Sequence, residues 1–171
     1  MKLGYFILRY VLAVLVVFSL PTMYFIFKPV TLGLSVFFLS IFFKEVSFSL
    51  NFIHVGSFSF ELISACIAGS AYLLLLLLNL LTPGIKFYKR IFLFLVSAGI
   101  FLVLNVIRLI VSISIFISRN ELFNETHLVF WYASVFFVVI IWFLCVLIFK
   151  IREVPVYSDI IQLVKTMKSK N

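Results

Sequence analysis

Charged residues are scarce in this sequence. Only 12% of its 171 residues are charged, whereas 65% are hydrophobic, and the mean hydropathy is +1.29. A soluble globular chain is about half apolar and about a quarter charged, so this chain has too little polar surface to face water on all sides. Several runs reach the roughly 20 apolar residues that cross a bilayer. The composition therefore predicts an all-α, polytopic membrane protein.

Cysteine and histidine are also rare, which argues against several kinds of site. The two cysteines, Cys66 and Cys145, lie near opposite ends of different apolar runs and make no disulfide framework. With two histidines, no HExxH motif and no cluster of His and carboxylate residues, the sequence disfavours a metalloprotease. We expect no metal and no other cofactor. The first apolar run lacks a small-residue cleavage site before a polar domain, so we expect no removed signal peptide.

Basic residues are present in excess, and they are concentrated at the ends of apolar runs. The net charge of +8 lies mostly where it would set membrane topology, which argues against nucleic-acid binding. The strongest runs are 62–81, 91–117 and 128–149. By the positive-inside rule, the basic loop 82–90 and the basic tail 150–171 are cytoplasmic. Consequently 62–81 runs from outside to inside, 91–117 returns, and 128–149 runs inward again.

The N-terminal part, residues 1–45, has two interpretations. We expect runs 3–27 and 30–43 both to cross, because Lys28 then lies in a cytoplasmic turn; this gives about five spans and an external N-terminus. The alternative is that one run is re-entrant or interfacial, with the N-terminus inside. Residues 46–61 alternate polar and apolar positions around a glycine, which predicts a short hairpin-like segment on the outer face. We expect residues 1–171 to form a single integral membrane domain, in which 62–149 is a three-helix part.

Three polar residues fall in the outer half of this bundle. Cys66 lies about 6 Å below the outer end of its span, and Arg108 about 14 Å from the outer end of its own. His127 begins the last span at the outer interface, and Asn105 precedes Arg108 by three residues on the same helical face. An arginine within an apolar span costs about 2.5–3.5 kcal/mol, so we interpret Arg108 as functional.

Each of these residues also has a purely structural interpretation. Arg108 can be held by backbone carbonyls or by Glu61, and Cys66 stands among small residues that suit close helix packing. His127 follows a polar turn that is typical of a helix N-cap. Their combination favours chemistry, because a helix N-terminus and a nearby arginine favour the thiolate and a histidine supplies a base or acid.

Three short segments resemble a known family. They are "ACIAG" around Cys66, "NVIRL" with Asn105 and Arg108, and the histidine of "THLVFW", His127. In order and spacing they resemble the exosortase/archaeosortase family, and the short chain is similar to its compact archaeal branch. These proteins are integral membrane cysteine enzymes with Cys, Arg and His in successive regions. One departure is that two residues, not one, separate the cysteine from the following glycine.

This resemblance implies a sortase-like cysteine peptidase or transpeptidase in the cell membrane, with its active site on the extracytoplasmic side. Its catalytic residues would be Cys66, Arg108 and His127, with Asn105 supporting Arg108. Its partners would be exported proteins that end in a short motif, a transmembrane helix and a basic cluster, with a membrane lipid as a candidate acceptor. The alternative is a non-enzymatic membrane subunit or small transporter that uses Arg108 as an anion or partner-helix site.

Overall fold

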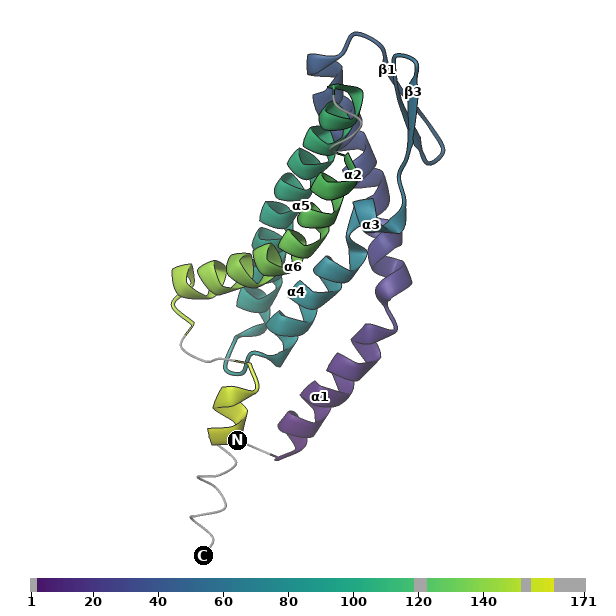
Figure 1. The fold of residues 1–171 in the computed structure, drawn as a ribbon. Helices are drawn as coiled ribbons and strands as arrows, with labels where there is room; N and C mark the ends of the chain where they lie inside the picture. The colour runs from purple at the N-terminus through teal and green to yellow at the C-terminus, as the bar shows by residue number, and fades with distance from the viewer. Residues whose placement is uncertain (1–2, 119–122, 152–154, 162–171) are drawn as a thin grey trace, which may run out of the picture.

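The structure is a computed structural model that describes residues 3–118, 123–151 and 155–161. The described chain is mostly helical, as expected, with one small sheet at one end of the helical bundle (Figure 1). Within the described residues, three helices are long and apolar enough to cross a membrane. These findings support a helical membrane protein.

The N-terminal third forms two helices, α1 (Leu3–Val17) and α2 (Leu20–Phe42). A turn at residues 18–19 separates the two helices, and Pro21 lies in the first turn of α2. A proline is favoured there because its missing N–H would have no intrahelical partner anyway. The predicted turn at Lys28 and Pro29 is wrong, because α2 continues through both residues. Lys28 instead donates a hydrogen bond to the side chain of Asn51, in the turn between the first two strands.

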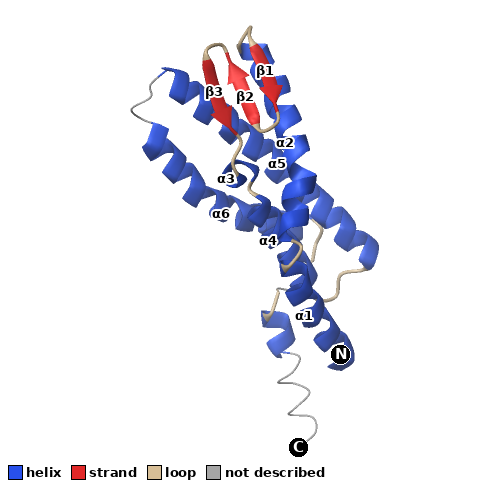
Figure 2. Ribbon diagram, turned by 90° about the vertical axis from the view of Figure 1, so that its right-hand side faces the viewer, coloured by secondary structure: helices blue, strands red, loops and turns tan. Residues whose placement is uncertain are grey.

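Residues 46–61 fold into a small antiparallel sheet of β1 (Val46–Ser49), β2 (Phe52–Val55) and β3 (Phe58–Glu61), in that order. Positive φ angles at Leu50 and Gly56 form the tight turns between them. In Figure 2, β1 lies on the α2 side of the sheet and β3 on the other side. The segment expected to be hairpin-like is thus two consecutive hairpins.

The next apolar run, expected as one span over residues 62–81, is two helices, α3 (Ser64–Ile67) and α4 (Gly69–Leu81). Ala68 separates them with a φ of 55°, in the left-handed region. A non-glycine residue there costs on the order of 1–3 kcal/mol, so the surrounding contacts must hold it. α4 extends for only about 20 Å at 1.5 Å per residue, which is shorter than the apolar core of a bilayer.

Two long helices complete the bundle, α5 (Phe87–Ser118) and α6 (Phe123–Ile148). They match the predicted runs 91–117 and 128–149 to within a few residues. The candidate membrane spans are α2, α5 and the part of α6 from Leu128 to Ile148, whereas α4 and most of α1 are shorter apolar helices.

The apolar core has two parts. One lies among α4, α5 and α6, around Tyr72, Leu93 and Val138. The other joins the sheet to α2 and α5, around Leu39 and Ile53, and it includes Ile67 of α3. Cys66 contacts this second part, so the α3 turn lies next to the core under the sheet.

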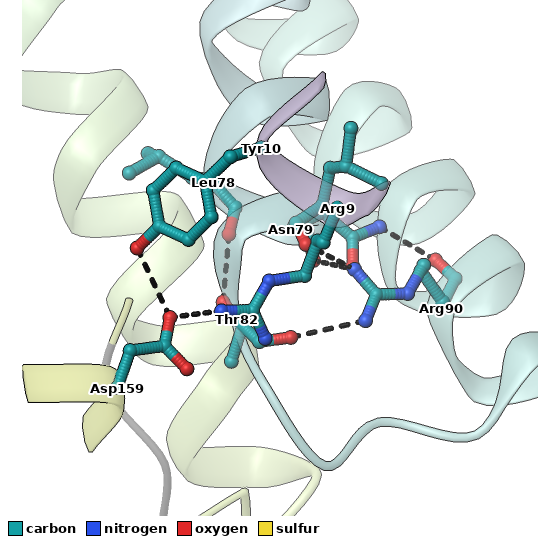
Figure 3. Close-up of polar contacts among 8 residues, drawn as sticks. Arg9, Tyr10, Leu78, Asn79, Thr82, Arg90 and Asp159 are labelled. Carbon is teal, nitrogen blue, oxygen red and sulfur yellow. Dashed lines mark hydrogen bonds and ion pairs between the residues drawn. The ribbon is translucent and has the colours of Figure 1, made fainter. Parts of the chain in front are cut away.

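At the end of the bundle opposite the sheet, polar contacts connect α1 to the segment after α6. Arg9 of α1 forms a buried ion pair with Asp159, in the short helical segment 157–161, and Tyr10 donates a hydrogen bond to the same carboxylate (Figure 3). The N-terminal helix and the segment that follows the last helix therefore meet at one face of the molecule.

Candidate functional site

Cys66 lies in a tight turn of backbone that the sheet and α4 hold from both sides. Its N–H donates to the carbonyl of Ile63 at 2.9 Å, and the N–H of Ala68 donates to the carbonyl of Ser64 at 3.1 Å. β3 ends only five residues before Cys66, and the left-handed Ala68 follows it by two. The thiol is thus presented by a short, sharply bent segment rather than by the interior of a long helix.

Gly69 fixes how closely this segment approaches α2. A Cβ atom built on Gly69 would lie 2.7 Å from the ring of Tyr24, closer than real Cβ atoms come to a neighbour. Glycine is therefore required where the chain leaves α3 and enters α4, because only a residue without a side chain lets the two backbones come together. This contact and the strained Ala68 fix the position of Cys66 on its α4 side.

Arg108 reaches across from α5 and holds the same turn. Its Nη2 donates to the carbonyl oxygen of Ala65 at 2.9 Å, and its Nη1 donates to Oγ of Ser134 on α6 at 3.0 Å. The guanidinium therefore connects α5 to α3 and α6, and its contact with α3 is at the residue before Cys66. These contacts agree with the structural interpretation in which carbonyls hold the arginine. An arginine nevertheless carries more N–H donors than these two bonds use.

Asn105 acts on the cysteine more directly than predicted. Its Nδ2 donates to the carbonyl oxygen of Cys66 itself at 2.9 Å, whereas we expected Asn105 to orient Arg108. Its Oδ1 is buried without a hydrogen-bond partner. The two side chains of α5 thus hold consecutive carbonyls, those of Ala65 and Cys66, and fix the backbone on which the thiol is mounted.

Cys66 and Arg108 line the same cavity, of about 570 Å³, between β3 and the second half of α5. Its walls are apolar at Ile113 and Phe116 and polar at Ser112, and Glu61 lies at its β3 side. A cavity of this size with few polar groups is typical of a ligand site. A second cavity of about 460 Å³ lies among α2, α4 and α6 and is also lined by Arg108. Arg108 lines both of these cavities and a third one, of about 180 Å³, between α5 and α6, and Cys66 lines the first.

The two histidines and the second cysteine are not among the partners described for Arg108 and Asn105. The backbone of His127 lies near the start of α6, but its side chain is outside the described residues, so its relation to Cys66 stays a prediction. His54 contacts Ser59 on the exposed side of the sheet, away from Cys66. Cys145 is buried in the core among α4, α5 and α6.

Sequence reasoning missed Ser134 and Ser112. Ser134 accepts the hydrogen bond from Arg108, and Ser112 donates to the backbone carbonyl of Arg108 at 2.8 Å and lines the first cavity. The sequence did hold a signal for Ser112, because it lies four residues after Arg108 and thus on the same face of the helix. Ser134 gave only a weak signal, since a single serine in an apolar span usually bonds its own helix, as Ser134 also does to Phe130.

Chemically, this arrangement places a thiol and a cation at one end of a mostly apolar cavity. A guanidinium near a sulfur favours the thiolate, and the same guanidinium can bind a developing oxyanion or an anionic ligand. In the described residues, no group of three or more His, Cys, Asp or Glu side chains is arranged to hold a metal ion.

Comparison with protein-family models, with curated proteins and with solved structures gives no match in any of the three searches. The family resemblance therefore rests on the quoted segments alone, and the geometry around Cys66 and Arg108 is the structural indication of function.

Proposed function

We propose that the protein is a membrane-embedded cysteine peptidase or transpeptidase of the exosortase/archaeosortase type. It would cleave the C-terminal sorting signals of exported proteins at the outer face of the cell membrane. The observation that supports this most is the pairing of Cys66 with Arg108 at one cavity, where the guanidinium binds the residue next to the cysteine. Structural burial of an arginine does not by itself require a thiol beside it.

The proposed reaction assigns one role to each residue. His127 takes the thiol proton of Cys66, and the thiolate attacks a backbone carbonyl of the substrate to give a tetrahedral oxyanion. Arg108 stabilises that oxyanion, an interaction typically worth about 3–4 kcal/mol. The amine leaves with the proton from His127, and a thioester remains on Cys66. An acceptor, a membrane lipid or water, then gives its proton to His127 and attacks the thioester, which releases the thiolate.

Asn105 would keep the nucleophile in place during these steps. Its hydrogen bond to the Cys66 carbonyl restrains the backbone, and the Arg108 bond to Ala65 restrains the preceding residue. A nucleophile held in reacting geometry gains rate because less freedom is lost on reaching the transition state.

The basic segments give the orientation in the membrane: the sheet lies outside, Cys66 lies toward the outer side, and residues 82–90 and the tail lie inside. Five crossings would put the N-terminus on the face opposite the tail. The ion pair of Arg9 with Asp159 favours the alternative, in which both ends are cytoplasmic. We therefore propose four crossings, where α1 with α2, and α3 with α4, each form one broken crossing.

The alternative function is a non-enzymatic subunit or small transporter that binds an anion or a partner helix through Arg108. The second cavity favours it, because Arg108 and Ser134 line that cavity while Cys66 does not. This alternative predicts that Cys66→Ser is silent and Arg108→Ala is not.

Co-expression with a tail probe tests the proposal. The probes are a library in which an exported reporter is followed by seven randomised residues, a transmembrane helix and a lysine cluster, and cleavage is scored by reporter size. We expect cleavage with the wild-type protein and with Cys145→Ala, and at least about a hundredfold less with Cys66→Ala. Equal cleavage with Cys66→Ala and Cys145→Ala would refute a cysteine mechanism.

A further inference from the structure

We propose that the outer edge of β3 is a docking strand for the substrate main chain, which adds to the sheet as a fourth strand and enters the cavity beside Cys66. This inference rests on the proposed function, and it names how an extended polypeptide would be recognised at that site. Among the described strands, β3 pairs only with β2, so its other edge has no strand partner.

The hydrogen-bond register identifies which backbone groups face that edge. The N–H of Leu62 donates to the carbonyl of Asn51 at 2.7 Å, so Leu62 faces β2. In an antiparallel ladder, alternate residues direct both their N–H and C=O to the same neighbour. Phe60 and Phe58 therefore face β2 as well. Ser59 and the N–H of Glu61 face outward, whereas the Glu61 carbonyl already accepts from the N–H of Ile63 at 3.1 Å. Ser59 and Glu61 are both exposed.

The opposite edge of the sheet behaves differently. The N–H of Gly56 donates to the carbonyl of Glu45 at 2.9 Å, which by the same alternation directs the backbone of Phe48 away from β2. That edge lies on the α2 side, where β1 contacts α2 (Figure 2). The β3 edge combines outward backbone groups with an adjacent cavity, since residues 57–63 all line the cavity that contains Cys66 and Arg108.

The position of this edge suits an extended peptide better than any other occupant. An unpaired edge beside a membrane bundle exposes N–H and C=O groups that need partners, and another main chain supplies them at matching spacing. Successive side chains of such a strand would alternate between the apolar wall at Ile113 and Phe116 and the exposed side. At its inner end the strand would bring a carbonyl toward Arg108, the cation at that end of the cavity. The occupant is therefore an extended segment with alternating apolar residues.

A proline at the edge tests the inference. Ser59→Pro removes one outward N–H and leaves the bonds between β2 and β3 intact, because Ser59 does not face β2. Ser59→Ala keeps that N–H and equally loses the contact with His54. Phe48→Pro removes an outward N–H from the opposite edge. Each variant is made in the full-length Cys66→Ala protein, which is co-expressed with the tail-probe library carrying a photo-cross-linker in the randomised segment.

We expect Ser59→Pro to lower the amount of captured probe roughly tenfold, since a main-chain hydrogen bond is worth about that factor. Ser59→Ala and Phe48→Pro should stay within about twofold of the parent. Equal capture by Ser59→Pro and Ser59→Ala overturns the inference, and so does a failure of the parent protein to capture any probe.

Amide hydrogen exchange of the Cys66→Ala parent protein, with Ser59 unchanged, provides a second test. The peptide is a synthetic copy of a captured probe. In the protein without peptide, the amides of Ser59 and Glu61 should exchange faster than those of Phe58 and Phe60. Saturation with the peptide should slow the first two amides, and their unchanged exchange overturns the inference. Capture without cleavage by the wild-type protein would instead refute the peptidase proposal and leave the docking strand standing.

Discussion

Two arginines of α5, Arg90 and Arg108, hold the two ends of the broken α3–α4 segment in different ways. Their separation of 18 residues is about five helical turns, so both lie on the same face of α5. Arg90 donates to three carbonyls at the end of α4, those of Asn79, Leu80 and Thr82 (Figure 3). Arg108 donates to one carbonyl of α3 and to one serine, and it lines cavities on both sides.

The difference separates a structural arginine from one that is available for chemistry. The last carbonyls of a helix have no intrahelical partner, and Arg90 satisfies three of them as a C-terminal cap. Each end also has an asparagine that bonds a backbone carbonyl across the contact: Asn79 of α4 donates to the Arg90 carbonyl, and Asn105 of α5 donates to the Cys66 carbonyl. The Arg108 end combines these supports with the thiol of Cys66 and the cavity that both residues line.

The largest effect on stability is expected from Arg90→Ala. It leaves three carbonyls at the end of α4 without their charged donor, so the free energy of unfolding should fall by about 3 kcal/mol. Thermal unfolding in detergent micelles measures this loss. If Arg108→Ala destabilises the protein as much as Arg90→Ala does, the proposed contrast between the two ends is wrong.

Gly69→Ala should have the second largest effect on stability, and it tests the packing at the α3 end. The added methyl group would meet the ring of Tyr24 at 2.7 Å, so overpacking should cost about 2 kcal/mol of unfolding free energy. Gly99→Ala is the matched control, because no atom lies within 4 Å of its added Cβ and alanine is the better helix former. A Gly69→Ala protein as stable as Gly99→Ala would contradict the close approach of α4 to α2.

The smallest effect should come from the two asparagines. Asn105→Ala and Asn79→Ala each remove one hydrogen bond, but each also removes a buried Oδ1 that has no partner. The two terms partly offset, so both variants should lose about 1 kcal/mol or less of unfolding free energy. Asn105→Ala should in addition slow probe cleavage about tenfold, because the Cys66 backbone is freed. If Asn79→Ala slows cleavage equally, the effect is one of general stability.

Much of the helical architecture could be predicted from the sequence, because long apolar runs report on helices directly. Runs 91–117 and 128–149 correspond closely to α5 and α6. Hydropathy alone could not locate the two breaks, at residues 18–19 and at Ala68. The first depends on which of two prolines begins α2, and the second on an alanine held at positive φ by its surroundings.

At the candidate site, the sequence indicated residue types but not contacts. Arg108 stood out because a charge within an apolar span is costly. Its partners Ala65 and Ser134 lie 43 and 26 residues away, and nothing local marks them. The acceptor of Asn105 is likewise a backbone carbonyl, and backbone groups carry no sequence signal. The proposed role of His127 rests on its position in the sequence and on the resemblance.

The rate at which iodoacetamide alkylates Cys66 tests most directly whether Arg108 serves the thiol. It needs no substrate, and Cys145→Ala serves as the parent protein so that one thiol reports. A nearby cation favours the reactive thiolate, so Arg108→Gln should slow alkylation about tenfold, whereas Arg90→Gln should leave the rate unchanged in the folded protein. Equal rates in the parent and in Arg108→Gln would contradict the account and leave Arg108, like Arg90, a structural residue.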